Sequence, residues 1–130
     1  MVLSQVKSGV DFEEYVADIL EHSGLYVERT KKSHDYGADL IVTYLGAKYC
    51  IQCKWSKNPI GVSAVQEVFG SLVIYGAQRG VVVTNSSFSG EAKRLAIMNQ
   101  VALFDGHMCS PYVADDSELG LDTVLFDLLR

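Results

Sequence analysis

The run Gly80-Val81-Val82-Val83-Thr84 constrains the fold of this chain more than any other feature. A continuous β-branched run without polar alternation is typical of a central strand that is covered on both faces. Apolar residues at helical spacing predict three helices, at residues 9–23, 62–75 and 90–99. Strand patterns occur in four further segments, at residues 25–30, 39–44, 48–55 and 101–104. The order predicts an α/β fold with a mixed sheet of about five strands flanked by helices.

The chain of 130 residues, 48% of them hydrophobic, is long enough for one domain with a substantial core. We expect a single domain over residues 1–130, with an acidic C-terminal extension from residue 107 that contains a helix at 119–129. No apolar run approaches the roughly 20 residues that span a bilayer, and the N-terminus lacks a signal pattern. Three cysteines suit a reducing compartment better than a disulfide framework, so we expect a cytoplasmic protein with no membrane partner.

The net charge of −5 hides an uneven distribution of charged residues. Residues 1–104 carry ten acids and ten bases, so the whole acidic excess lies beyond them. Between Arg29 and Lys57, six bases accompany two acids. A basic zone around a small acidic centre suits a phosphate substrate with a divalent cation. A solvated loop at Lys31-Lys32 is the alternative interpretation.

Polar residues interrupt two neighbouring strand patterns. Asp39 opens the first pattern, and Gln52 and Lys54 lie near the end of the second. The segment Leu45-Gly46-Ala47 between them predicts a turn, so the two strands should pair as a hairpin. Residues two apart in a strand share a face, so Gln52 and Lys54 should point the same way.

The opposite side of the second strand is expected to face the core through Tyr49, Ile51, Cys53 and Trp55. Cys50 and Cys53 resemble a metal-binding pair, but residues three apart in a strand point to opposite faces. Zinc would also need further Cys or His ligands nearby, and the three histidines are scattered. We therefore interpret these cysteines as structural.

The first two predicted helices each contain one informative position. In the helix at 9–23, Glu13 lies at the edge of the apolar stripe and is the carboxylate expected to face inward. A boundary Glu whose side chain reaches solvent is an equally good interpretation from helix geometry alone. In the helix at 62–75 the expected buried stripe includes Phe69, and Gly70 is expected to permit close packing.

Hydrolysis of a phosphodiester needs an activated water, stabilisation of the charge on the phosphate, and a fate for the leaving oxygen. Asp39 is the best candidate ligand for Mg²⁺, with the Gln52 side-chain carbonyl and the Cys53 backbone carbonyl on the adjoining strand. Lys54 places a cation where phosphate charge develops or where attacking water lies. Asp35 remains open as a metal ligand, a supporting carboxylate or a turn residue, the last being favoured by Asx-turn chemistry.

Several motifs in order resemble the Mrr-type restriction endonuclease catalytic domain, a branch of the PD-(D/E)XK nuclease superfamily. The resemblance covers residues 9–106, and its motifs are Asp11-Phe12-Glu13, Asp35–Ile41, Ile51–Lys54, Ile60-Gly61-Val62, Gly80–Asn85, Phe88-Ser89 and Leu103–Gly106. It implies a restriction-endonuclease-like fold that cleaves DNA with Mg²⁺, for which Mn²⁺ can substitute.

By position, the resemblance assigns catalytic roles to four residues. Asp39 matches the family's metal-binding Asp, and Gln52 replaces the more usual Asp or Glu, as is common in this branch. Lys54 matches the catalytic Lys, and Glu13 matches the helix carboxylate that supports the metal or water. DNA contacts are expected from a further set of basic residues, Lys31, Lys32 and Lys57.

Members of this family often carry a separate DNA-binding domain before the catalytic one, whereas about eight residues precede the first helix here. A homodimer, a partner subunit, or a longer polypeptide would then be needed to select the target. Two other functions are compatible with the same fold: a structure-selective nuclease such as a Holliday-junction resolvase, and a non-catalytic DNA-binding or assembly module. The simplest alternative treats Gln52 and Lys54 as edge-strand solubilising residues and Asp39 as a turn residue.

Overall fold

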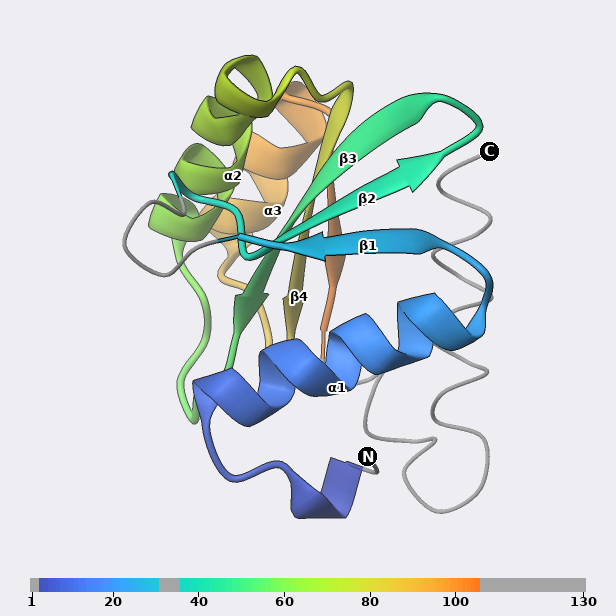
Figure 1. Cartoon of the computed structure of the whole chain (residues 1–130). Helices are drawn as coiled ribbons and strands as arrows, with labels where there is room; N and C mark the ends of the chain where they lie inside the picture. Colours follow the sequence, from blue (N-terminus) through green and yellow to red (C-terminus); the bar gives the residue numbers. More distant parts are fainter. Residues whose placement is uncertain (1–2, 31–35, 106–130) are drawn as a thin grey trace.

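The computed structural model describes residues 3–30 and 36–105 of the chain. The predicted helix at 119–129 and the rest of the acidic extension lie outside these residues. Figure 1 shows the elements in sequence order, η1 (Leu3–Gln5), α1 (Gly9–His22), β1 (Tyr26–Arg29), β2 (Leu40–Tyr44), β3 (Ala47–Lys54), α2 (Val62–Tyr75), β4 (Arg79–Thr84), α3 (Gly90–Met98) and β5 (Val101–Phe104).

The five strands form one sheet in the order β1-β2-β3-β4-β5. The pairs β1–β2 and β2–β3 are antiparallel, whereas β3–β4 and β4–β5 are parallel. The hairpin between β2 and β3 turns at Leu45 and Gly46, which both have positive φ, at 51° and 82°. Positive φ at both central residues matches the turn geometry that suits a twisted hairpin. The structure confirms the predicted mixed α/β sheet and its hairpin.

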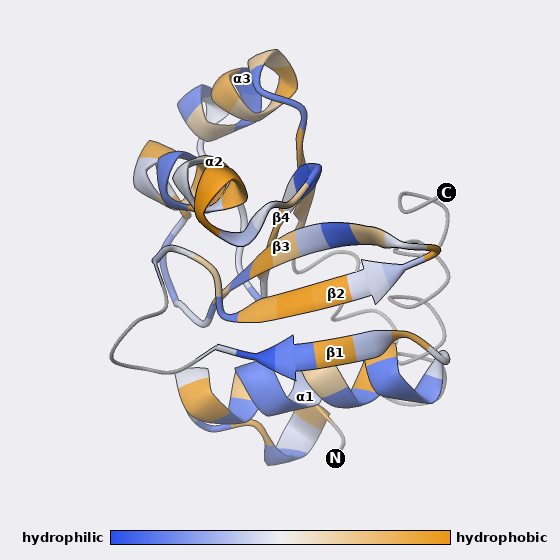
Figure 2. Ribbon diagram, turned by 45° about the horizontal axis from the view of Figure 1, so that its top comes forward, coloured by the Kyte–Doolittle hydropathy of each residue, from blue (hydrophilic) through white to orange (hydrophobic). Residues whose placement is uncertain are grey.

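Helices cover both faces of the sheet. α1 packs on one face, and α2 and α3 pack on the other, with the apolar strand β2 between these layers in Figure 2. Val81 and Val83 face the α1 layer, Val82 faces the α2–α3 layer, and all three are 0% exposed. The β-branched run of β4 therefore fills both halves of the core, as its sequence predicts.

α1 is fixed at both of its ends. The Ser8 side chain accepts a hydrogen bond from the Asp11 N–H at 3.2 Å, which caps the first turn. Toward the other end, Glu14 and Glu21 both bind Arg29 of β1, with nitrogen–oxygen distances of 2.7 and 3.1 Å. Hydrogen bonds to Glu14 and Glu21 raise the pKa of Arg29, and the bond from Arg29 lowers the pKa of Glu21. These contacts join the helix to the edge strand β1.

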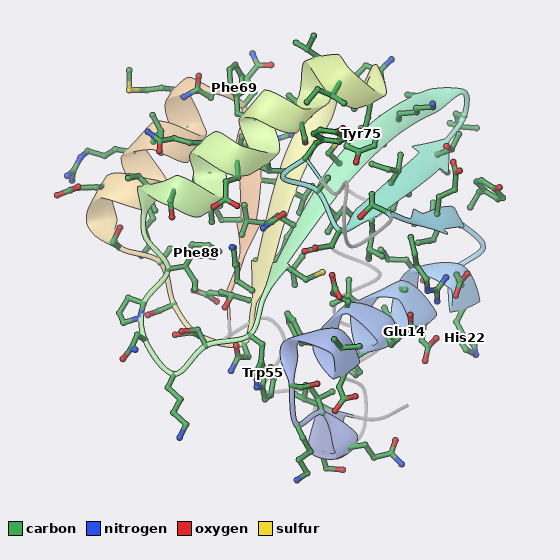
Figure 3. The ribbon with its side chains drawn as sticks, turned by 60° about the vertical axis from the view of Figure 1, so that its left-hand side comes forward. Glu14, His22, Trp55, Phe69, Tyr75 and Phe88 are labelled. Atoms are coloured by element: carbon green, nitrogen blue, oxygen red, sulfur yellow. The ribbon has the colours of Figure 1, made fainter. Side chains whose placement is uncertain are left out.

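Three packing predictions differ from the structure. Trp55 lies one residue beyond β3, is 36% exposed, and contacts Phe12 beside the start of α1 (Figure 3). Phe69 is 46% exposed, because the buried face of α2 is formed by Ala64, Val65, Val68 and Ser71. A Cβ on Gly70 would meet nothing within 4 Å, so this glycine marks no close packing. α2 is apolar on nearly all sides, and this hides the buried stripe from a periodicity argument.

None of the helices in residues 3–30 and 36–105 combines the length and the apolar character that crossing a bilayer requires.

Candidate active site

The start of β2 meets the end of β3 because the two strands are antiparallel. Asp39 lies one residue before β2, and its N–H donates to the Ile51 carbonyl at 2.8 Å. Its carboxylate accepts a hydrogen bond from the Cys53 N–H at 2.8 Å. The Asp39 carbonyl also accepts from the Thr30 N–H at 3.0 Å. These bonds hold the Asp39 carboxylate beside the end of β3. It lies at Cys53, the residue between Gln52 and Lys54.

Gln52 and Lys54 lie on the same face of β3, as the strand alternation predicts. Gln52 is 7% exposed, so its amide must find hydrogen-bond partners within the protein. The hydrogen-bond network assigns the amide orientation, in which the nitrogen donates to the Gly37 carbonyl at 2.6 Å. In this orientation the amide oxygen accepts from the Lys54 ammonium at 3.2 Å. The Gln52 side chain thus connects the Gly37 backbone to Lys54.

Gly37 packs directly on the backbone of α2. It has a φ of +89°, and a Cβ at this position would lie 2.2 Å from the Glu67 carbonyl oxygen. Only glycine permits both this conformation and this close approach. The chain segment that leads to Asp39 therefore lies between α2 on one side and Gln52 of β3 on the other.

An open groove of about 420 Å³ brings the predicted catalytic residues together. Glu13 projects into it from α1, and Asp39, Gln52, Cys53 and Lys54 line it from the sheet. Glu13 and Asp39 also line the neighbouring hollow between α1 and β1. The boundary position of Glu13 on the helix wheel is therefore the position that reaches the groove.

Three residues in or behind the groove received no role from the sequence reasoning. Glu67 of α2 lines the groove, and its carboxylate lies 3.9 Å from the Lys54 ammonium. It is the one charged residue between Val62 and Tyr75, which is the signal that points to it. Thr84, which ends the β-branched run, and Asn85, which follows it, hydrogen-bond to the chain at the end of β3 and just after it.

Thr84 and Asn85 fix the chain where β3 ends. The Thr84 hydroxyl donates to the Lys54 carbonyl at 2.6 Å and accepts from the Ser86 N–H at 3.1 Å. The Asn85 amide oxygen accepts from the Ser56 N–H at 2.8 Å, and its nitrogen donates to the Ser56 carbonyl at 3.0 Å. Together they extend the pairing of β3 and β4 past Lys54 and so fix the backbone that carries this side chain.

The cysteines lie on opposite faces of β3, as the strand geometry predicts. Cys50 packs in the α2–α3 core and Cys53 packs against the α1 core. Burial raises the pKa of the Cys50 thiol, so it is a poor metal ligand or nucleophile. Within the described part of the chain, no three His, Cys, Asp or Glu side chains cluster as a metal site on their own.

The donors at the groove nevertheless have the chemistry that Mg²⁺ uses. This ion takes oxygen ligands, keeps several waters and commonly needs only one or two protein carboxylates together with substrate phosphate. Asp39 and Glu13 supply carboxylates, Gln52 supplies an amide oxygen, and Cys53 lines the same groove. The donor set fits a hard divalent cation, because one cysteine without histidines beside it does not make up the ligand set of a zinc site.

Of the predicted DNA-binding lysines, Lys57 lies in the described part of the chain, and it is not part of the groove lining. Lys57 is exposed in the loop after β3, among residues 55–61. Lys31 and Lys32 lie outside the described residues, as does Asp35. Their predicted roles therefore stay predictions.

The structure is similar to several solved proteins at low sequence identity. A protein of unknown function, AF1548, matches with a TM-score of 0.65 and 20% identity, over 85% of this chain and 65% of that one. The DNA modification-dependent restriction endonuclease AspBHI matches with a TM-score of 0.51 and 14% identity, over 95% and 43%. MspJI restriction endonuclease in complex with a 27-mer oligonucleotide has a TM-score of 0.48 and 21% identity, over 90% and 30%.

This chain thus spans from 30% to 65% of the length of these proteins, and the likeness of AF1548 and AspBHI is one of fold. No curated protein matches the sequence closely enough to be counted as a relative. The Mrr_cat family model, described as restriction endonuclease, matches residues 5–109, which is most of the chain and contains the whole groove. The chain belongs to the Mrr_cat restriction endonuclease family.

Proposed function

We propose that this protein is a divalent-metal-dependent endonuclease that hydrolyses phosphodiester bonds in DNA, with Mg²⁺ as the metal and Mn²⁺ as a substitute. One observation carries the proposal: Glu13, Asp39, Gln52 and Lys54, from a helix and two strands, line a single groove. Membership of a restriction endonuclease family supports the same conclusion from the sequence as a whole.

The charge of the groove supports the need for a cation. Among the residues that the structure describes, its lining includes three carboxylates, Glu13, Asp39 and Glu67, and one ammonium group, Lys54, which gives these residues a formal charge of −2. A phosphodiester entering this groove alone would meet net repulsion. A bound divalent cation would cancel this local charge, polarise the phosphoryl oxygens and lower the pKa of coordinated water.

Each lining residue has a role that its position supports. Asp39 would hold the metal through its carboxylate, while the Cys53 N–H keeps that carboxylate oriented. The Gln52 amide oxygen and the Cys53 carbonyl are the further protein ligands that we propose. Glu13, at the opposite wall of the groove, would orient the attacking water or a metal-bound water. Lys54 would stabilise the charge that develops on the phosphate.

The reaction is a hydrolysis, so its atoms balance with water as the only co-substrate. The oxygen of water forms a bond to phosphorus, one ester P–O bond breaks, and the leaving oxygen takes up a proton. We propose that Lys54 and Glu13, which both line the groove, act on the phosphate and the water of this reaction. The products are a phosphate monoester and a free hydroxyl.

Binding of DNA would require basic residues outside the groove. We propose that Lys57, together with Lys31 and Lys32, contacts the phosphate backbone, so binding should weaken steeply as salt concentration rises. One groove cuts one strand at a time, so we propose that a homodimer or a partner subunit supplies a second groove for cutting both strands together.

The experiment is a cleavage assay of the purified chain on plasmid, linear duplex, methylated duplex and four-way-junction DNA, in Mg²⁺, in Mn²⁺ and in EDTA. The proposal predicts nicking or cleavage in either metal and none in EDTA. Preferential cleavage of the junction would instead identify a structure-selective nuclease. Binding of DNA in EDTA without cleavage in any metal would identify a non-catalytic module and contradict the proposal.

A further inference from the structure

Within residues 3–30 and 36–105, the ammonium group of Lys54 has two polar side-chain neighbours, and they come from different elements. The Gln52 amide oxygen of β3 lies 3.2 Å away, and the Glu67 carboxylate of α2 lies 3.9 Å away. The Lys54 side chain is 32% exposed and the Glu67 side chain is 45% exposed, so the pair lies at the mouth of the groove. We infer that Glu67 is a positioning residue that, with Gln52, holds the Lys54 ammonium over the groove before DNA binds. The effect on cleavage rests on the proposed function, whereas the contacts of Lys54 with Gln52 and Glu67 do not depend on it.

The backbone of Glu67 is fixed, although its carboxylate is half exposed. Its carbonyl oxygen packs on Gly37, where a Cβ would approach to 2.2 Å. Residues three before and four after Glu67 share its helix face, and these residues, Ala64 and Ser71, are 1% and 0% exposed. Glu67 therefore lies at the edge of the buried face of α2, and the helix cannot rotate to carry it away from Lys54.

Fixing Lys54 matters because lysine is a flexible side chain with a compact point charge. An ammonium group on four methylenes samples many rotamers unless partners select one, and selection in advance lowers the cost of reaching the transition state. Glu67 selects one rotamer of Lys54, but it also adds a negative charge at the groove, which repels DNA. The expected consequence is faster chemistry and weaker binding of DNA, an opposition that a residue with only a structural role would not produce.

The first test measures how fast the Lys54 amine reacts with a labelling reagent. It needs neither metal nor DNA, and it does not depend on cleavage activity. An amine-selective acylating reagent labels the protein, and mass spectrometry compares Lys54 with Lys57, which is exposed. In Glu67→Ala, Lys54 should label about threefold faster than in the wild type, because one charged partner is lost. Lys57 should not change. Glu28→Ala, which removes an exposed carboxylate from the edge strand β1, should leave both rates as in the wild type.

The second test separates turnover from binding. Glu67→Ala should lower the single-turnover cleavage rate about tenfold, through misplacement of Lys54, and should bind DNA in EDTA about threefold more tightly. Glu67→Gln keeps an oxygen acceptor and should recover part of the rate. In a Lys54→Ala background, Glu67→Ala should cause no further loss of rate.

The two tests fail in different ways. An unchanged labelling rate of Lys54 in Glu67→Ala would overturn the role of Glu67, whether or not the protein cleaves DNA. A labelling increase in a protein that never cleaves DNA would retain the positioning contact and reject the proposed function.

Discussion

The Asp39 carboxylate accepts a hydrogen bond from the Cys53 N–H at 2.8 Å, which joins the start of β2 to the end of β3. The two residues that flank Cys53 are Gln52 and Lys54, so this one bond places the proposed metal-binding carboxylate beside both. The bond also separates two properties of Asp39 that mutation can test one at a time. One is its charge, and the other is its capacity to accept the Cys53 N–H.

Asp39→Asn should keep the fold and lose the activity. Its amide oxygen can still accept from Cys53, whereas the charge that a metal requires is gone. Cleavage should fall at least about a hundredfold, with little change in the thermal midpoint. Asp39→Ala should lose the activity and also about 1 kcal/mol of stability, because the Cys53 N–H loses its partner. Equal cleavage by Asp39→Asn and the wild type would contradict the assignment.

Gly37→Ala should destabilise the protein by at least about 2 kcal/mol, because the added Cβ meets the α2 backbone and the positive φ is strained. Gly46→Ala is the matched control, since Gly46 also has positive φ, at 82°, but nothing within 4 Å of a Cβ. It should cost only about 1 kcal/mol. Urea unfolding measures both variants. Equal losses would show that the contact between Gly37 and Glu67 is unimportant.

Thr84→Val should lower both stability and cleavage. The change preserves shape but leaves the Lys54 carbonyl and the Ser86 N–H without the Thr84 hydroxyl, at a cost of about 1–3 kcal/mol. Because Thr84 is buried beside the end of β3, the loss should also loosen Lys54 and slow cleavage about tenfold. Chemical denaturation and single-turnover assays check the two effects. A variant that loses stability but cleaves at the wild-type rate would show that the end of β3 needs no such support.

Arg29→Ala should reduce stability near neutral pH and have little effect in acid. The bond from Arg29 lowers the folded-state pKa of Glu21, so its stabilisation is present above the unfolded value of 4.5 and is lost as pH falls through the folded value. The side chains are 39% to 44% exposed, so screening limits the whole cluster to about 1 kcal/mol. Urea unfolding of the wild type and the variant across this pH range should converge in acid. A constant difference would indicate that Arg29 acts through packing alone.

Much of the fold follows from local sequence patterns. The β-branched run of β4 and the turn at Gly46 each predict a feature that the structure contains. The orientation of α2 does not follow in the same way, because its sequence is apolar on nearly every side. Phe69 is consequently exposed where the stripe predicts burial. Only tertiary contact with the sheet selects which apolar face is covered.

The residues of the candidate site likewise fall into those that local sequence patterns predict and one that only tertiary contacts bring to the groove. Asp39, Gln52 and Lys54 stand out because they are polar residues in apolar strands, and Glu13 stands out on a helix wheel. Glu67 reaches the groove only through the contact of α2 with Gly37, a relationship between residues thirty positions apart in the sequence. Local sequence patterns do not predict the contact between Gly37 and Glu67. The one charged residue in an otherwise apolar helix is nevertheless a signal that points to Glu67.

The central claim is that Lys54 acts on DNA in a metal-dependent cleavage at this groove. Its most direct test compares single-turnover cleavage of duplex DNA in Mg²⁺ by the wild type, Lys54→Ala and Lys48→Ala. Lys48 is an exposed lysine near the other end of β3 and is the matched control. We expect cleavage by the wild type and Lys48→Ala at equal rates, a loss of at least about a hundredfold in Lys54→Ala, and none in EDTA. Cleavage by Lys54→Ala at the wild-type rate, or by the wild type in EDTA, would contradict the account.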